Sequence, residues 1–90
     1  MSAAPSNRGE VLELIRTHLS DELGIDRGII EEDSRFKEDL EADSLDLVEL
    51  VVELEDTYGI RIAEDEAEHI KTVGQAVDFV LSHVSVNPAR

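Results

Sequence analysis

The stretch that decides the fold is residues 43–59, which read DSLDLVELVVELEDTYG. Asp43 stands just before the apolar pattern and is predicted to cap a helix, with Asp46 in the place of the capping-box acid. Gly59 is of the residue type that most often ends a helix. The stretch therefore predicts a helix over residues 44–58.

The apolar residues of this helix fall into two sets when each residue is advanced by about 100°. The set expected to face the core comprises Leu47, Leu50, Val51, Leu54 and Tyr58. A second apolar spot lies outside that arc and consists of Leu45, Val48 and Val52, with Glu49, Glu55 and Asp56 beside it. An ordinary surface helix carries one apolar stripe. The second spot therefore either packs under a neighbouring loop or docks a partner, with acidic residues at its rim.

Three further helices are expected. Apolar residues at helical spacing predict a helix over residues 9–23, ended by Gly24, and residues 63–70 predict one or two helical turns. Thr72 is expected to cap a last helix that runs to about residue 84. Residues 25–40 show no sustained period and predict a long loop, attached to the core by Ile29, Ile30, Phe36 and Leu40. The expected fold is all-α, a small four-helix bundle of three main helices and one short helix.

The expected domain organisation is a flexible N-terminus (residues 1–8), one domain (residues 9–85) and a flexible C-terminus (residues 86–90). The N-terminal residues lack the apolar segment of a secretion signal, and no stretch is apolar enough to span a membrane, so a cytoplasmic protein is expected. The 90 residues include no cysteine. This excludes a disulfide framework, a thiolate metal site and a cysteine nucleophile.

The charge is strongly acidic and unevenly placed. With 22 acidic and 8 basic residues the net charge is −14, of which residues 31–68 contribute −13. Such a charge repels nucleic-acid phosphates and anionic lipid headgroups, and it attracts partners that present Lys and Arg. We therefore expect no nucleic-acid or membrane partner, and an acidic working surface around the middle helix.

Ser44 lies in the first turn of the middle helix. A capping role is one interpretation, because serine is a common cap. If Asp43 is the cap instead, the Ser44 hydroxyl projects freely from the helix N-terminus, where N–H groups and the helix dipole favour an attached phosphate. The sequence leaves both interpretations open.

An enzyme with Ser44 as nucleophile is not expected. The G-x-S-x-G turn is absent, and none of the three histidines, His18, His69 and His83, is placed near Ser44 in the sequence. A short chain also has little room for a catalytic cleft.

A calcium-binding loop is not expected either. A loop started at Glu38 or at Asp39 lacks the glycine that such loops require at their sixth position. No metal site is predicted, and weak divalent binding to Glu38, Asp43 and Asp46 is a hypothesis based on charge crowding alone.

Residues 40–50 read LEADSLDLVEL and resemble the attachment motif of acyl carrier proteins, and the likeness extends over about residues 10–84. The resemblance implies that Ser44, flanked by Asp43 and Leu45, receives 4′-phosphopantetheine from coenzyme A through a separate phosphopantetheinyl transferase (holo-carrier synthase). The thiol of that arm then carries acyl groups as thioesters between enzymes of fatty acid biosynthesis. A carrier of a polyketide or other specialised pathway, and an acidic adaptor without a covalent arm, are the alternatives.

The resemblance also implies roles for other residues of a monomeric, non-enzymatic carrier. Its partners would be acyl transferases, ketoacyl synthases, reductases and dehydratases with basic docking patches. The partner-docking residues by position are Leu45, Asp46, Val48, Glu49, Val52, Glu55 and Asp56. The candidates for an acyl pocket are Phe36, Leu50, Val51, Leu54, Ile62, Ala67 and Ile70, each of which could equally be a core residue. One departure is Glu41, because the family commonly has glycine at or near that position; the lost backbone freedom could alter the loop or the transferase preference.

Overall fold

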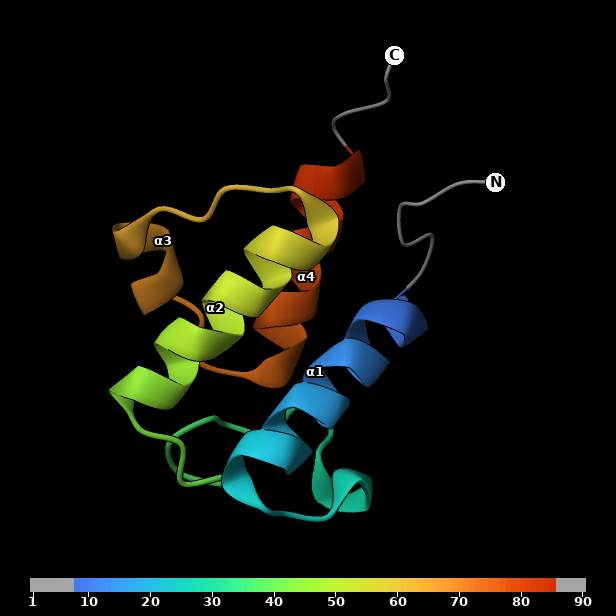
Figure 1. Ribbon diagram of the computed structural model, residues 1–90, viewed down its shortest axis with the longest axis vertical. Helices are drawn as coiled ribbons and strands as arrows, with labels where there is room; N and C mark the ends of the chain where they lie inside the picture. The colour runs from blue at the N-terminus through green and yellow to red at the C-terminus, as the bar shows by residue number, and fades with distance from the viewer. Residues whose placement is uncertain (1–7, 86–90) are drawn as a thin grey trace.

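The computed structural model describes residues 8–85, with side chains through residue 83 (Figure 1). Its helices are α1 (Arg8–Leu23), α2 (Ser44–Tyr58), α3 (Glu64–Glu68) and α4 (Val73–Ser85). No strand occurs within residues 8–85, so the predicted all-α bundle of three main helices and one short helix is confirmed. Within the same residues, no helix is long and apolar enough to cross a membrane.

The predicted termini need one correction. Arg8 opens α1 and pairs with Glu32 and Asp78, so it belongs to the folded part and not to a flexible N-terminus. The predicted flexibility of residues 1–7 and 86–90 concerns residues outside those that the structure describes.

The ends of α2 follow the predicted caps. Asp43 accepts a hydrogen bond from the Asp46 N–H, and Asp46 accepts one from the Asp43 N–H, both at 3.0 Å. Gly59 adopts the left-handed conformation (φ +65°), and its N–H donates to the Glu55 carbonyl at 2.9 Å. These local signals fix α2 at the predicted residues because they satisfy backbone groups that a helix end otherwise leaves unpaired.

Two further predicted helix caps are also confirmed. Gly24 has φ +69° and donates its N–H to the Ser20 carbonyl at 2.9 Å, which ends α1. Thr72 caps α4 by accepting a hydrogen bond from the Gln75 N–H at 3.1 Å. The helices are therefore delimited by the residue types expected at their ends.

The core lies where α1, α2 and α4 contact one another, with α4 behind the other two in Figure 1. Its buried residues on these helices are Val11, Ile15, Leu19, Leu50, Leu54, Val73, Ala76, Val77 and Val80. Leu47, Val51 and Tyr58 pack against the core while partly exposed, which confirms the predicted core face of α2. Burial of these apolar side chains is the main source of stability.

The long segment between α1 and α2 is ordered by contacts with the start of α4. The Phe36 N–H donates to the Lys71 carbonyl, and the Val73 N–H donates to the Ser34 carbonyl, both at 3.0 Å. The segment buries Ile30, Phe36 and Leu40, as predicted. The prediction was wrong for Ile29, which is 56% exposed because it lies in a short 3₁₀ turn (Arg27–Ile29) on the surface. This segment sets the direction from which the chain enters α2.

Candidate functional site

Ser44 is the first residue of α2 and is exposed. Asp43 supplies the side-chain cap, and the Ser44 hydroxyl makes no hydrogen bond to any residue that the structure describes. The capping interpretation of Ser44 is therefore wrong, and the free-hydroxyl interpretation agrees with the geometry. A phosphate attached to this oxygen would lie at the positive end of a 15-residue helix.

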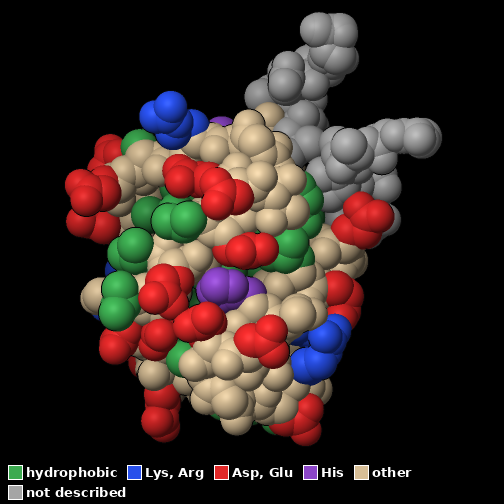
Figure 2. Space-filling view, in the orientation of Figure 1, with side chains coloured by type: hydrophobic (Ala, Val, Ile, Leu, Met, Phe, Trp, Pro, Cys, Tyr) green, Lys and Arg blue, Asp and Glu red, His purple; other side chains and the backbone are tan. Residues whose placement is uncertain are grey.

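The second apolar spot of α2 lies on the surface. Leu45 is 64% exposed, Val48 56% and Val52 48%. The hypothesis that these three residues pack under the long loop is therefore wrong. Figure 2 shows hydrophobic side chains along α2 with acidic side chains next to them. We call Leu45, Val48 and Val52 the exposed apolar patch.

The acidic residues around the exposed apolar patch are not equivalent. Glu49 and Asp56 are exposed. Asp46 is partly buried and closes the capping box, and Glu55 accepts a hydrogen bond from the Ile62 N–H at 2.8 Å. Asp46 and Glu55 therefore also hold backbone groups of this chain, a role that spacing along the sequence did not indicate.

Three carboxylates, one on α1 and two on α2, lie close together. One oxygen each of Glu22, Asp46 and Glu49 lies within 4.8 Å of the others, an arrangement that could accept a divalent ion. The cluster differs from the hypothesis made from the sequence, since it includes Asp46 but neither Glu38 nor Asp43. Contact between the Glu22 and Glu49 carboxyl groups raises the pKa of Glu49 above its ordinary value, and the charge of Glu22 adds to this.

This contact predicts a pH-dependent effect of Glu49→Gln. Because the folded state holds the Glu49 proton more tightly than the unfolded state does, stability falls as pH rises from 4.5 through the raised pKa. Besides Glu22, the groups that act on Glu49 are Asp46, which raises its pKa further, and His18, which lowers it. The variant is expected to have a higher Tm than the wild type at pH 7, with the gap closing below about pH 4.5.

Thermal melts at pH 4 and pH 7 check this prediction. Glu53→Gln removes the same charge from another exposed position of α2 and is the control, with a smaller expected change of Tm. A Glu49→Gln variant that is no more stable than the wild type at pH 7 would show that Glu22 and Glu49 do not destabilise the fold by repulsion.

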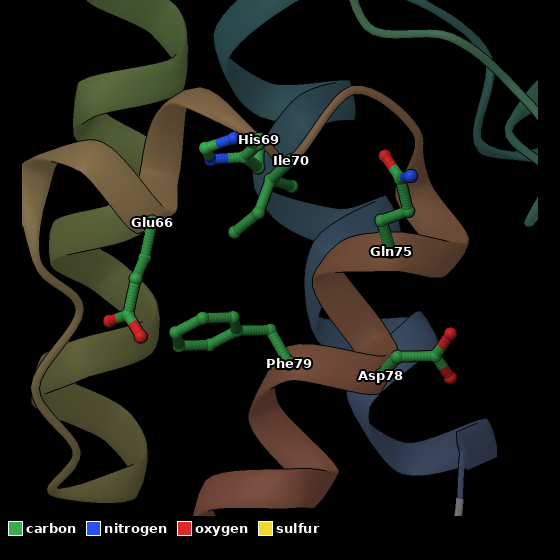
Figure 3. Close-up of a pocket in the computed structure, with 6 residues that line it drawn as sticks. All are labelled: Glu66, His69, Ile70, Gln75, Asp78 and Phe79. Carbon is green, nitrogen blue, oxygen red and sulfur yellow. The ribbon is translucent and has the colours of Figure 1, made fainter.

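The candidate acyl-pocket residues lie in or against the core. Phe36, Leu50, Leu54, Ile62 and Ile70 are buried, and Val51 and Ala67 pack against them. An open hollow of about 400 Å³ lies between α3 and α4 and is lined by Glu66, His69, Ile70, Gln75, Asp78 and Phe79. In Figure 3 the Phe79 ring points toward Glu66, with Ile70 above it. Of the seven candidates the hollow includes Ile70 alone, and the sequence did not single out Phe79.

The histidines do not form a catalytic pair with Ser44. His69 Nδ1 lies 2.8 Å from the Asp65 carbonyl oxygen, and His83 Nδ1 lies 3.1 Å from that of Phe79. His18 lies on α1, with its Nε2 buried and without a partner among the described residues. No histidine is therefore hydrogen-bonded to the Ser44 hydroxyl within the part of the chain that the structure describes.

Comparison with known proteins gives the family. Residues 13–80 match the family model described as the phosphopantetheine attachment site. The acyl carrier protein of Rubrobacter xylanophilus is 49% identical over 77 residues, which cover 86% of this chain and 95% of that protein. This chain belongs to the acyl carrier protein family.

Other acyl carrier proteins agree in sequence and in fold. That of Lactobacillus johnsonii is 47% identical over 74 residues, or 82% of this chain and 92% of that protein. The solved structure of the acyl carrier protein from Enterococcus faecalis has a TM-score of 0.74 and 39% identity, covering 86% of this chain and 98% of that one. The fold and the identity therefore point to the same family.

Acyl carrier proteins are carriers on which phosphopantetheine is the prosthetic group. The geometry at the start of α2 fits such a group, because an exposed and unbonded hydroxyl stands at a helix N-terminus. The absence of cysteine fits as well, since the group brings its own thiol.

Proposed function

We propose that this acyl carrier protein bears 4′-phosphopantetheine on Ser44 and serves fatty acid biosynthesis in the cytoplasm. The observation that carries the proposal is that the cap of α2 does not involve the Ser44 side chain. Asp43 and Asp46 form the capping box, so the cap does not use the Ser44 hydroxyl, which is exposed and free to react. The family match over residues 13–80 supports the choice of group.

Attachment uses a single oxygen of this chain. The Ser44 Oγ forms a bond to the phosphorus next to pantetheine in coenzyme A, and the pyrophosphate P–O bond breaks. The product 3′,5′-ADP leaves with the electron pair of that bond, and the hydroxyl proton passes to a base of the transferase. Once attached, the group supplies the thiol that carries acyl chains. This chain itself catalyses no reaction in the proposal, and its role is to present Ser44 and a docking surface.

The proposed docking surface comprises the exposed apolar patch and its exposed acids, Glu49 and Asp56, with Asp46 and Glu55 contributing charge at its edge. Its partners are the phosphopantetheinyl transferase and the acyl transferases, ketoacyl synthases, reductases and dehydratases of the pathway. Each would cover the apolar centre and place Lys or Arg opposite the acids. Desolvation of the centre gives affinity, and the charge of −13 over residues 31–68 speeds encounter.

The docking proposal predicts that Val48→Asp slows partner reactions. A charge at the centre of the patch must be desolvated or repelled, so kcat/KM is expected to fall at least about tenfold, while far-UV circular dichroism stays unchanged. The fold tolerates the change because Val48 is 56% exposed.

A matched pair of charge reversals on α2 separates local contact from general charge. Glu49→Lys lies beside the patch, whereas Glu53→Lys lies one turn further along the same side of α2, at a hollow that Glu53 lines with Glu13 and Thr17 of α1. The first is expected to slow partner reactions more than the second. If the partner reactions of the wild type, Val48→Asp and Glu49→Lys have equal rates, the docking proposal is contradicted.

Incubation with coenzyme A and a phosphopantetheinyl transferase tests the attachment. The intact protein is expected to gain the mass of one phosphopantetheine. No gain with several transferases would contradict the proposal and would favour an acidic adaptor that binds its partners without a covalent arm. The acyl groups found on the thiol of protein purified from its own cells test the assignment to the fatty-acid pathway.

A further inference from the structure

Glu41 has an unusual backbone conformation. Its φ is +58°, and no other non-glycine residue among those described has a positive φ. In this left-handed region the Cβ atom crowds the following carbonyl oxygen, so the conformation is unfavourable for every residue with a side chain except at special sites. Glycine would adopt it without this strain.

The fold holds Glu41 in this conformation from both sides. Leu40 and Ala42 are buried, at 5% and 3% exposure. The Leu40 N–H donates to the Arg35 carbonyl at 3.1 Å, and the Ala42 N–H donates to the Phe36 carbonyl at 2.8 Å. The strain at Glu41 is therefore relieved only by breaking these bonds or by moving a side chain out of the core.

The Glu41 side chain makes no interaction with the described residues that would compensate for this strain. The side chain is exposed, and its carboxylate forms no hydrogen bond or ion pair with any residue from 8 to 85. Strained residues without a structural contact are typical of functional positions. The carboxylate of Glu41 is free to meet a group of another molecule, three residues before Ser44.

We propose that Glu41 is a recognition residue for the enzyme that attaches phosphopantetheine to Ser44, pairing with a Lys or Arg of that enzyme. The inference rests on the proposed function. Attachment is the one reaction that takes place at the Ser44 oxygen itself, so its catalyst must cover the surface next to Ser44. Enzymes that act on the thiol at the far end of the arm dock on α2, but they do not need to reach the Ser44 oxygen or the loop before it. Glu41 extends the acidic surface from α2 into the preceding loop and favours a basic partner there.

The test compares three variants in purified, full-length form. Glu41→Gly removes both the strain and the carboxylate, whereas Glu41→Gln keeps the strain and removes only the charge. Glu53→Gln removes one charge from an exposed position on α2, ~14 Å from Ser44 along the helix axis. Each is measured for Tm and for kcat/KM of phosphopantetheine attachment, with coenzyme A and a bacterial phosphopantetheinyl transferase.

Glu41→Gly is expected to raise the Tm and to slow phosphopantetheine attachment. Its Tm is expected to rise by about 2–4 °C, because the strain is lost and the greater freedom of the unfolded glycine offsets only part of the gain. Its attachment is expected to slow by about fivefold, the range of one exposed ion pair. Glu41→Gln is expected to slow equally without a change in Tm, and the gap should narrow with added salt. Glu53→Gln is expected to stay within about twofold of the wild type.

Two outcomes overturn the inference separately from the proposed function. If the wild type gains phosphopantetheine while both Glu41 variants gain it as fast, Glu41 has no role in recognition although Ser44 carries the arm. The same conclusion follows if Glu53→Gln slows attachment as much as Glu41→Gln does, because the effect is then general charge. A wild type that gains no mass contradicts the proposed function and the inference together.

Discussion

Replacement of Ser44 with alanine is expected to abolish phosphopantetheine attachment completely. Alanine lacks the oxygen that forms the bond to phosphorus, so no slower route through the same residue remains. Because the side chain is exposed and Asp43 caps the helix, the free energy of unfolding is expected to change by less than about 0.5 kcal/mol. Intact mass after incubation with coenzyme A and a transferase, together with a urea melt, measures both quantities.

Asp43→Ala is the matched control for this prediction. It removes the cap and is expected to lower the free energy of unfolding by about 1 kcal/mol, while Ser44 keeps its hydroxyl. If Ser44→Ala destabilised the protein and Asp43→Ala did not, the assignment of the cap would be reversed. A Ser44→Ala protein that still gained phosphopantetheine would place the attachment at another residue.

Replacement of Leu54 with alanine is expected to cost about 2–5 kcal/mol of stability. Leu54 is 1% exposed, at the centre of the predicted core face of α2, so the change removes buried apolar surface and leaves a cavity. Domains of this size are stable by only about 5–15 kcal/mol, so the loss is a large share. Thermal or urea denaturation followed by circular dichroism measures it.

Val52→Ala is the control on the same helix. Val52 is 48% exposed and belongs to the exposed apolar patch, so its replacement is expected to change stability by less than about 0.5 kcal/mol. Equal losses for Leu54→Ala and Val52→Ala would mean that the patch is part of the core, and the docking proposal would then have no surface to act on.

The helices could be predicted from the sequence because their signals are local. Asp43, Gly59 and Thr72 lie at helix ends and act on backbone groups within a few residues. The long segment could not be predicted in detail, because Phe36 and Ser34 are held by Lys71 and Val73 through hydrogen bonds between distant parts of the chain. The exposure of Ile29 follows from the surface 3₁₀ turn in which it lies and not from its residue type.

The site could be predicted in part. The place of Ser44 in the first turn follows from the capping pattern, and the two apolar sets of α2 follow from spacing, because a helix fixes which residues share a face. The group on Ser44 was implied by the resemblance alone. The contact between Glu22 and Glu49 depends on how α1 packs against α2, which spacing within one helix does not reveal. Acyl-pocket residues cannot be told from core residues by type, since both are apolar; the seven candidates stay a prediction, with Ile70 alone at the hollow.

Glu41 stands where the family commonly has glycine, and its backbone has the conformation that glycine adopts most easily. The resemblance marked the position as unusual, and the structure gives the physical reason, a φ of +58° between two buried neighbours. A propensity argument alone would have replaced the residue with glycine. The proposal of a functional carboxylate rests on this conformation and on the exposed side chain, and the attachment rate of Glu41→Gly tests it.

The free hydroxyl of Ser44 at the start of α2 is the proposed site of the prosthetic group. The most direct measurement is peptide mass spectrometry of the wild-type protein after incubation with coenzyme A and a phosphopantetheinyl transferase. We expect one phosphopantetheine, located on Ser44, and no modification of other serines such as the buried Ser34. A protein that stays unmodified with several transferases, or one modified at a serine other than Ser44, would contradict the claim.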